Sequence, residues 1–410
     1  MRVVMGGESL EGPLTGIGHY TYNLASQLLK SGEIESLDFL VHGRIKGPDF
    51  LNRHSTAAPE SDNKDAGDFD ANDGADQRGR AWIADALGKA RSIAAKSTVA
   101  VNLYERAIPA MERRCLRVYG RDDIFHSPNY MLPEFPGHTV VSILDLSTYR
   151  YPEHHPEARV RFVNRHIERS VAQADHIITI SEFIKAEIVE RFRLPEARIS
   201  VTHLGANQGF HPRSAESVTE QLQRFAPNLR YKNYFLFTSS IEPRKNLDRV
   251  IDAYLAYREG TSGDALPLVV TGAAGWKSQH THSRLASLQR QGLLLHLGYI
   301  SQEMLPFLVA GARAVVYPSL YEGFGLPVLE AMQSGTATLT SRDSAMAEVA
   351  GDASLLVNPL DIQAIADALA RLAGDEKVAD QLVNDGLDRA RCFSWDACAR
   401  QTLQVYSRLD

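Results

Sequence analysis

The sequence predicts an α/β protein with two doubly wound domains, each built on a parallel sheet. Short β-branched runs alternate with amphipathic helical stretches along most of the 410 residues. Apolar runs between helices are typical of strands that are buried on both faces of a parallel sheet. The runs fall into two sets, separated at 212–232 by prolines and polar residues, which indicates a domain boundary there.

Six strands are predicted in each half. In the first half they are 2–5, 37–42, 123–125, 140–144, 176–180 and 199–203. In the second half they are 235–238, 268–271, 293–297, 314–317, 336–340 and 355–357. The clearest amphipathic helices are 20–30, 159–173, 247–258 and 362–372. Because helices alternate with the strands, we expect parallel pairing in both sheets.

Chain length fits two or three domains, at about 150 residues per domain. We expect a first domain at 1–215, with an insertion at about 43–120, and a second domain at 216–392. Residues 393–410 are predicted to form a helix that packs back on the first domain. The insertion then accounts for the third domain that the length allows.

Composition excludes several classes of protein. A net charge of -6 argues against a dedicated nucleic-acid binder. The three cysteines fit neither a disulfide framework nor a zinc pattern, which favours a reducing compartment. No signal peptide is expected at the N-terminus, and no apolar run approaches the roughly 18 residues that a membrane span needs. We therefore expect a cytoplasmic protein.

The predicted insertion contains two oppositely charged stretches. Residues 55–79 are acidic and almost without apolar side chains, as in a disordered surface loop. Residues 80–120 carry more basic than acidic side chains, with apolar residues at roughly helical spacing. Two interpretations of 80–120 stay open. One is a helix pair that packs on its own domain, and the other is a peripheral contact with the inner face of the cytoplasmic membrane.

The most informative stretch is 317–332, where a predicted strand runs through a glycine-rich turn into a helix. Open α/β sheets bind ligands at the carboxyl ends of their strands. We expect the helix to begin at Pro327, so that the N–H groups of Gly325 and Leu326 suit a phosphate. Glu322 and Glu330 flank this site, and sugar hydroxyls would satisfy their carboxylates.

A second turn lies at 238–247, directly after the predicted strand 235–238. It contains Arg244 and Lys245, which should open on the same edge of the sheet. A guanidinium and an ammonium at that edge would neutralise a diphosphate.

A third glycine-rich turn follows the first predicted strand and contains Gly16 and Gly18. Glycines allow the backbone to approach a ligand closely, although a plain connection would look the same. His126 and Asp145 also stand at predicted strand ends, and both are candidates for the acceptor side. A metal site is not expected, since His154, His155, His280 and His282 lack a nearby pattern of acidic ligands.

The Glu322-to-Glu330 spacing, the Pro-Arg-Lys-Asn turn at 243–246 and the two α/β halves resemble retaining GT-B glycosyltransferases of glycosyltransferase family four. The resemblance implies two Rossmann-like domains that face a cleft, the first for the acceptor and the second for a nucleotide sugar. It implies catalytic roles for Glu322, Lys245 and Arg244. It implies donor-binding roles for Glu330, Gly323, Phe324, Gly325, Leu326, Gly16, Gly18 and Ser240.

Two positions depart from the family pattern. The family commonly has an Arg where this chain has Ser240, so Arg244 would supply that charge. Related enzymes often have His-Asp where this chain has Leu144-Asp145, so only Asp145 carries the match at that strand end.

The resemblance implies a retaining hexosyl transfer from a nucleotide sugar, which is a substrate and not a cofactor. Independence from metal is expected because no Asp-x-Asp motif stands at the crevice. The Pro-Arg-Lys-Asn form favours GDP-mannose or a GDP-deoxyhexose as donor. A growing lipid-linked bacterial polysaccharide, such as O-antigen, is the expected acceptor. A nucleotide-sugar epimerase on the same fold is the main alternative. A nicotinamide-dependent oxidoreductase is disfavoured because Thr21 replaces the third glycine of its turn. A non-catalytic sugar-binding module is disfavoured by the intact charged residues.

Overall fold

The computed structural model describes residues 1–12, 14–54, 109–261 and 265–409. By its contacts the chain divides into two compact units. The first unit is Met1–Tyr22, Ile34–His126 and Pro133–His138. The second unit is Asn23–Glu33, Ser127–Leu132 and Thr139–Asp410. The domain limits at 1–215 and 216–392 stay a prediction.

The first sheet has seven strands among the described residues, in the order β3-β2-β1-β4-β5-β6-β7. They are β1 (Arg2–Gly6), β2 (Ser36–Val41), β3 (Arg44–Lys46), β4 (Ile124–Ser127), β5 (His138–Ser142), β6 (His176–Thr179) and β7 (Ile199–Val201). The helices of this part are α1 (Gly16–Ser31), α4 (Ser147–Arg150), α5 (Glu157–Gln173) and α6 (Glu182–Phe192). Short 3-10 segments occur at η1 (Glu8–Leu10), η2 (Pro48–His54), η3 (Pro152–His154) and η4 (Glu196–Arg198).

Strand β3 was not predicted. It pairs antiparallel with β2, through a turn in which His42 has φ 47° and Gly43 has φ 70°. Two consecutive positive φ values are typical of the tight hairpin turns that match strand twist. The start of the predicted insertion therefore extends the sheet edge. Residues 109–116 are helical, whereas 55–108, with the acidic stretch and most of the basic one, lie outside the described residues.

The second sheet has the order β10-β9-β8-β11-β12-β13, and all its pairings are parallel. Its strands are β8 (Phe235–Thr238), β9 (Leu268–Thr271), β10 (Leu294–Gly298), β11 (Ala314–Tyr317), β12 (Ala337–Ser341) and β13 (Leu355–Val357). Its helices are α7 (Ala215–Phe225), α8 (Leu247–Gly260), α9 (Gln279–Arg290), α10 (Leu305–Gly311), α11 (Leu326–Gln333), α12 (Ala345–Ala350), α13 (Ile362–Gly374) and α14 (Glu376–Ala390). The prediction of an α/β protein with two parallel sheets is confirmed.

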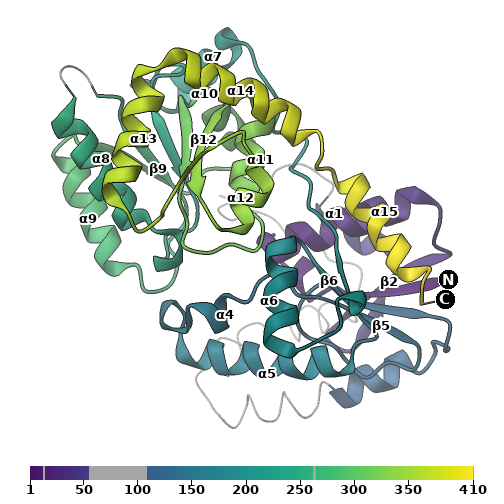
Figure 1. The fold of residues 1–410 in the computed structure, drawn as a ribbon. Helices are drawn as coiled ribbons and strands as arrows, with labels where there is room; N and C mark the ends of the chain where they lie inside the picture. The colour runs from purple at the N-terminus through teal and green to yellow at the C-terminus, as the bar shows by residue number, and fades with distance from the viewer. Residues whose placement is uncertain (13, 55–108, 262–264, 410) are drawn as a thin grey trace, which may run out of the picture. The chain divides into compact units, whose positions relative to one another are not determined.

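Helices cover both faces of the second sheet. Figure 1 shows α8, α9 and α13 on one face and α10, α11 and α12 on the other. The strand order reverses direction between β8 and β11, which is where doubly wound sheets bind ligands. Side chains such as Phe235, Phe237 and Val316 are completely buried in the core beneath, so the strand ends sit on a rigid base.

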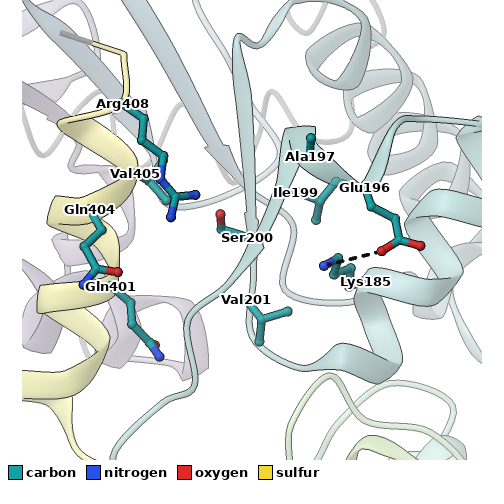
Figure 2. A pocket seen from close by; sticks show the side chains of 10 residues that line it. All are labelled: Lys185, Glu196, Ala197, Ile199, Ser200, Val201, Gln401, Gln404, Val405 and Arg408. Carbon is teal, nitrogen blue, oxygen red and sulfur yellow. Dashed lines mark ion pairs between the residues drawn. The ribbon is translucent and has the colours of Figure 1, made fainter.

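The last helix, α15 (Trp395–Tyr406), lies against the strand β7 and the segment after it. The Sγ of Cys398 is 3.9 Å from the backbone oxygen of Thr202. Figure 2 shows Gln404 and Arg408 across a cavity of about 430 Å³ from Ser200. The predicted site residues do not line this cavity. No helix among the described residues combines the length and the apolar character that a membrane crossing requires.

Candidate functional site

The turns at 242–246 and 317–325, which lie within the predicted stretches 238–247 and 317–332, come together because their strands are neighbours. β8 and β11 pair in parallel, with Phe235 opposite Ala314, so both turns leave the same edge of the sheet. The backbone N–H of Leu320 donates to the Arg244 carbonyl at 2.9 Å, and the Ser319 hydroxyl oxygen lies 3.0 Å from the same carbonyl oxygen. The two turns are thus joined through their backbones.

Asn246 fixes where the basic turn ends. It follows the 3-10 turn η5 (Pro243–Lys245) and has φ 66°, which lets helix α8 start at once. Its side-chain Nδ2 donates to the carbonyls of Pro318 at 2.9 Å and Pro359 at 2.7 Å. One amide therefore ties the basic turn to the loops after β11 and β13.

Four charged side chains form an ion cluster at this edge: Glu242, Arg244, Lys245 and Glu322. Glu322 accepts from Lys245 Nζ at 2.7 Å and from Arg244 Nη1 at 3.0 Å. Glu242 accepts from Arg244 Nη2 at 3.0 Å. Two positive and two negative groups therefore balance one another, which offsets the cost of burying them.

Neutral donors complete the environment of Glu322. The hydroxyl of Tyr317 donates to its Oε1 at 2.8 Å and the hydroxyl of Ser319 donates to the same atom at 2.9 Å. Tyr317 also accepts from Lys245 Nζ at 3.0 Å. The Glu322 carboxylate thus has four partners from two segments of chain, 244–245 and 317–319, so its position is well defined.

The charge states follow from these contacts. Burial alone would raise the pKa of Glu322, but Arg244 and Lys245 outweigh it and hold this pKa at about 2. Burial opposes the charge of Arg244, but the carboxylates of Glu322, Asp145 and Glu242 outweigh burial and raise its pKa. Burial, followed by the charge of Arg244, lowers the pKa of Lys245. Glu322 is therefore a carboxylate at neutral pH and cannot act as a general acid there.

Glu330 has the opposite surroundings. It lies in α11, and its carboxyl makes no hydrogen bond or ion pair with the residues that the structure describes. Burial raises its pKa to about 8, so the group is largely protonated at pH 7. A protonated carboxyl both donates and accepts, which suits a hydroxyl pair such as that of a ribose.

The turn before α11 is built on two glycines. A Cβ on Gly323 would lie 2.0 Å from the Leu144 carbonyl oxygen, and Gly325 has φ 119°. The helix begins at Leu326 rather than at Pro327 as predicted, because Gly325 in this conformation already serves as the N-cap. The Phe324 side chain packs on Phe393, with ring centroids 5.7 Å apart.

Arg244 and Ser240 differ in what they can offer a ligand. Arg244 Nη1 donates to the Tyr321 carbonyl at 2.5 Å as well as to Glu322, so both of its N–H groups are engaged, and Nη2 engages one of its two on Glu242. Its Nε is buried and makes no hydrogen bond with the described residues. Ser240 is exposed. A bidentate Nη grip on a diphosphate, as the sequence suggested, would require Arg244 to leave its carboxylates.

Asp145 lies in the same unit as the ion cluster. Its carboxylate accepts from the backbone N–H of Ser147 at 2.8 Å, at the start of α4. Its charge helps to raise the pKa of Arg244. It is thus close enough to act on the ion cluster electrostatically.

The other predicted residues belong to the first unit. His126 lies within β4 and is completely buried, and burial lowers its pKa to about 3, so it is neutral at pH 7. A Cβ on Gly18 would lie 2.6 Å from the Ser9 carbonyl oxygen, which makes this glycine a packing requirement. Gly16 begins α1 and a Cβ there would meet nothing.

Sequence reasoning missed Glu242, Tyr317 and Ser319 as members of the site. All three stand within the two turns that were singled out, so their place at strand ends was an available signal. Within the described part of the chain, no three His, Cys, Asp or Glu side chains gather as a metal site would need, and independence from metal stays a prediction.

Residues 219–389 match the family described as "Glycosyl transferases group 1". O-antigen chain mannosyltransferase B of Escherichia coli is 32% identical over 409 residues, which is 100% of both chains. Among solved structures, HepE of Anabaena with UDP and glucose aligns with a TM-score of 0.69 at 15% identity, over 100% of both chains. Sucrose-phosphate synthase of Thermosynechococcus elongatus aligns with a TM-score of 0.67 at 18% identity, over 100% of this chain and 99% of that one.

Proposed function

Because this chain belongs to the group 1 glycosyl transferases, we propose that it transfers mannose, with retention, from a GDP-linked donor to a growing bacterial polysaccharide. Its fold is GT-B, and it is a glycosyltransferase that acts on a glycan. The epimerase alternative is not supported by the relatives. We therefore propose guanine as the donor base, mannose as the transferred sugar and a bacterial polysaccharide as the acceptor.

The observation that carries the proposal is the full-length likeness to an O-antigen chain mannosyltransferase, together with the ion cluster at the reversal of the second sheet. The likeness spans both halves of the chain, so it includes the half expected to select the acceptor. A shared catalytic domain alone would not support a particular acceptor.

The ion cluster supports a mechanism based on electrostatics. Breaking the glycosidic bond to a diphosphate builds negative charge on the leaving oxygens, and positioned cations stabilise it. Lys245 Nζ has three donors and uses two of them on Glu322 and Tyr317, which leaves one for a phosphate oxygen. The first-turn N–H groups of α11 lack partners within the helix and favour an anion.

Glu322 would orient the donor sugar rather than attack it. Its carboxylate is held by four donors and has a pKa of about 2, so it is a weak base and a poor nucleophile. Glu330 is expected to be largely protonated, so the two acids do not form the acid–nucleophile pair of a retaining glycosidase. The leaving phosphate would then take the acceptor proton, as the family resemblance implies.

The test is a panel of GDP-, UDP- and ADP-sugars, scored by thermal shift and by hydrolysis without acceptor. GDP-mannose is expected to raise the melting temperature most, since a ligand at 100 times its Kd stabilises a protein by about 2.7 kcal/mol. Transfer to a mannose-terminated saccharide should follow. Stabilisation by UDP-sugars, with none by GDP-sugars, would refute the donor assignment.

A further inference from the structure

Aromatic side chains from two separate segments meet near the ion cluster. His155, just after η3, has its ring centroid 5.6 Å from that of Trp276, in the loop before α9. Arg159 lies over the same indole at 5.2 Å. Lys277 Nζ donates to the Glu153 carbonyl at 2.6 Å. All of these residues belong to the second unit, within Thr139–Asp410.

Several polar atoms of this group are buried without partners. Both ring nitrogens of His155, the Nδ1 of His154 and the indole N–H of Trp276 make no hydrogen bond with the described residues. His155 is only 3% exposed. A buried polar group left unsatisfied costs about 1–3 kcal/mol, so four such atoms in one place are expensive. Buried polar groups without a partner are uncommon in folded proteins, so four of them together point to a partner that lies outside the protein chain.

The same segment is attached to the Glu322 loop. Tyr151 stacks on His154 with ring centroids 5.2 Å apart, and its hydroxyl donates to the Leu320 carbonyl at 3.3 Å. The Tyr151 ring is also 5.8 Å from that of Tyr321. Two further unpartnered buried atoms, Arg244 Nε and Glu242 Oε2, belong to the ion cluster.

The pKa of His155 also shows that its ring lies close to Arg244 and Asp145. Burial is the main cause that lowers the pKa of His155 to about 4, and the charge of Arg244 is the next. Asp145 acts on the same ring in the opposite direction. At neutral pH His155 is therefore uncharged, with one ring nitrogen as donor and the other as acceptor.

We propose that His154, His155 and Trp276 form the subsite for the terminal sugar of the acceptor. This assignment rests on the proposed function. Each sugar hydroxyl donates one hydrogen bond and accepts others, which matches a neutral imidazole beside an indole N–H. The His155 imidazole and the Trp276 indole are themselves uncharged at neutral pH, so their polar atoms suit the hydroxyls of a sugar. Asp145, predicted on the acceptor side, acts on the same ring.

The experiment measures sugar binding and donor chemistry separately in the full-length protein. Binding of octyl α-mannoside is followed calorimetrically with GDP present, and hydrolysis of GDP-mannose is measured without acceptor. His155→Phe keeps the ring size but removes both nitrogens, and should weaken octyl mannoside binding at least tenfold. Trp276→Phe removes only the indole N–H and should weaken it about fivefold, as expected for one hydrogen bond. Hydrolysis and the KM for GDP-mannose should stay within twofold.

Two further variants separate binding from folding. His155→Asn restores one donor and one acceptor, and should recover part of the lost affinity. His280→Phe changes a histidine whose side chain is 83% exposed on α9, and should leave affinity unchanged. Melting temperatures confirm that every variant is folded.

The outcomes distinguish failure of the proposed function from failure of the subsite assignment. If the wild-type protein does not hydrolyse or transfer from GDP-mannose, the proposed function fails. If it does so but octyl mannoside does not bind, or binds His155→Phe equally well, the subsite assignment is wrong. If His155→Phe raises the KM for GDP-mannose instead, the group contacts the donor sugar, and the assignment to the acceptor is overturned.

Discussion

Glu322 and Glu330 lie eight residues apart in one loop and helix, yet their surroundings are opposite. Glu322 accepts from Lys245, Arg244 and two hydroxyls, and its pKa falls to about 2. Glu330 has no such partner among the described residues, and burial raises its pKa to about 8. The same residue type therefore presents an anion at one position and a neutral acid at the other. Charge at this site is set by neighbours from a distant turn, and not by the motif.

We expect the largest effect from removing the negative charge of Glu322. Glu322→Gln keeps the shape of the side chain but removes the charge that pairs with Arg244 and Lys245. We expect transfer to fall about 10²–10³-fold, the usual effect of removing one positioned electrostatic contact. Leaving two buried cations with one carboxylate should also cost about 3 kcal/mol of stability.

The pH dependence of that stability is a second readout. A lowered carboxyl pKa contributes stability above the unfolded value of about 4.5, and this contribution is lost as the pH falls towards 2. Denaturant unfolding of the two proteins should therefore differ at pH 7 and converge in acid. An equal difference at pH 7 and pH 2.5 would contradict the ionic account.

We expect the next largest effect from removing the positive charge of Lys245. Lys245→Met should lower transfer about 10²-fold by removing one donor to the leaving phosphate. The double variant with Glu322→Gln should be less destabilised than the sum of the single variants, because a buried charge pair is removed together. Lys185→Met is the matched control, since its ion pairs with Glu182 and Glu196 are at 3.9 and 4.0 Å on the surface. Additive destabilisation would show that the two charges do not interact.

For Glu330 we expect the opposite pH dependence of the free energy of unfolding. A raised carboxyl pKa means that the native state holds its proton longer, so stability falls as the pH rises from about 4.5 to 8. Glu330→Gln should remove this fall and be more stable than the wild type at pH 8, on the order of 2 kcal/mol. Chemical denaturation at pH 5 and pH 8 measures it, with Glu376→Gln on the exposed face of α14 as control. A similar slope in wild type and variant would show that Glu330 ionises normally.

The smallest effect tests one contact within the cluster. Tyr317→Phe removes the hydroxyl that donates to Glu322 and accepts from Lys245. We expect about 1 kcal/mol of lost interaction and about a fivefold slower transfer. Tyr234→Phe is the control, because that buried hydroxyl donates only to the Leu308 carbonyl at 2.6 Å. It should lower stability without slowing transfer.

Much of the second half was predictable from sequence. The ranges 235–238, 268–271, 314–317 and 355–357 agree with β8, β9, β11 and β13, because apolar runs bounded by turn residues have sharp limits. The hairpin strand β3 was missed because its three residues are too few to show an alternation of apolar and polar side chains. Its His42-Gly43 turn was the available signal.

The part of the site that depends on the order of the strands was predictable from the sequence. Adjacent parallel strands bring Arg244 and Glu322 to one edge, which the pattern of strands implies. The pairing of Glu242 with Arg244 and the isolation of Glu330 depend on side-chain distances of a few ångströms, which tertiary packing decides. His155 and Trp276 meet from segments about 120 residues apart in sequence, and no local pattern announces such a contact.

Asn246 has a consequence for engineering. It combines a left-handed backbone with side-chain bonds to Pro318 and Pro359, so it joins three loops without touching the ion cluster. Glycine there would preserve the backbone but release the loops, while alanine would lose both. A designer who wishes to exchange the loops for a new donor can therefore treat this asparagine as the fixed anchor on which replacement loops must be built.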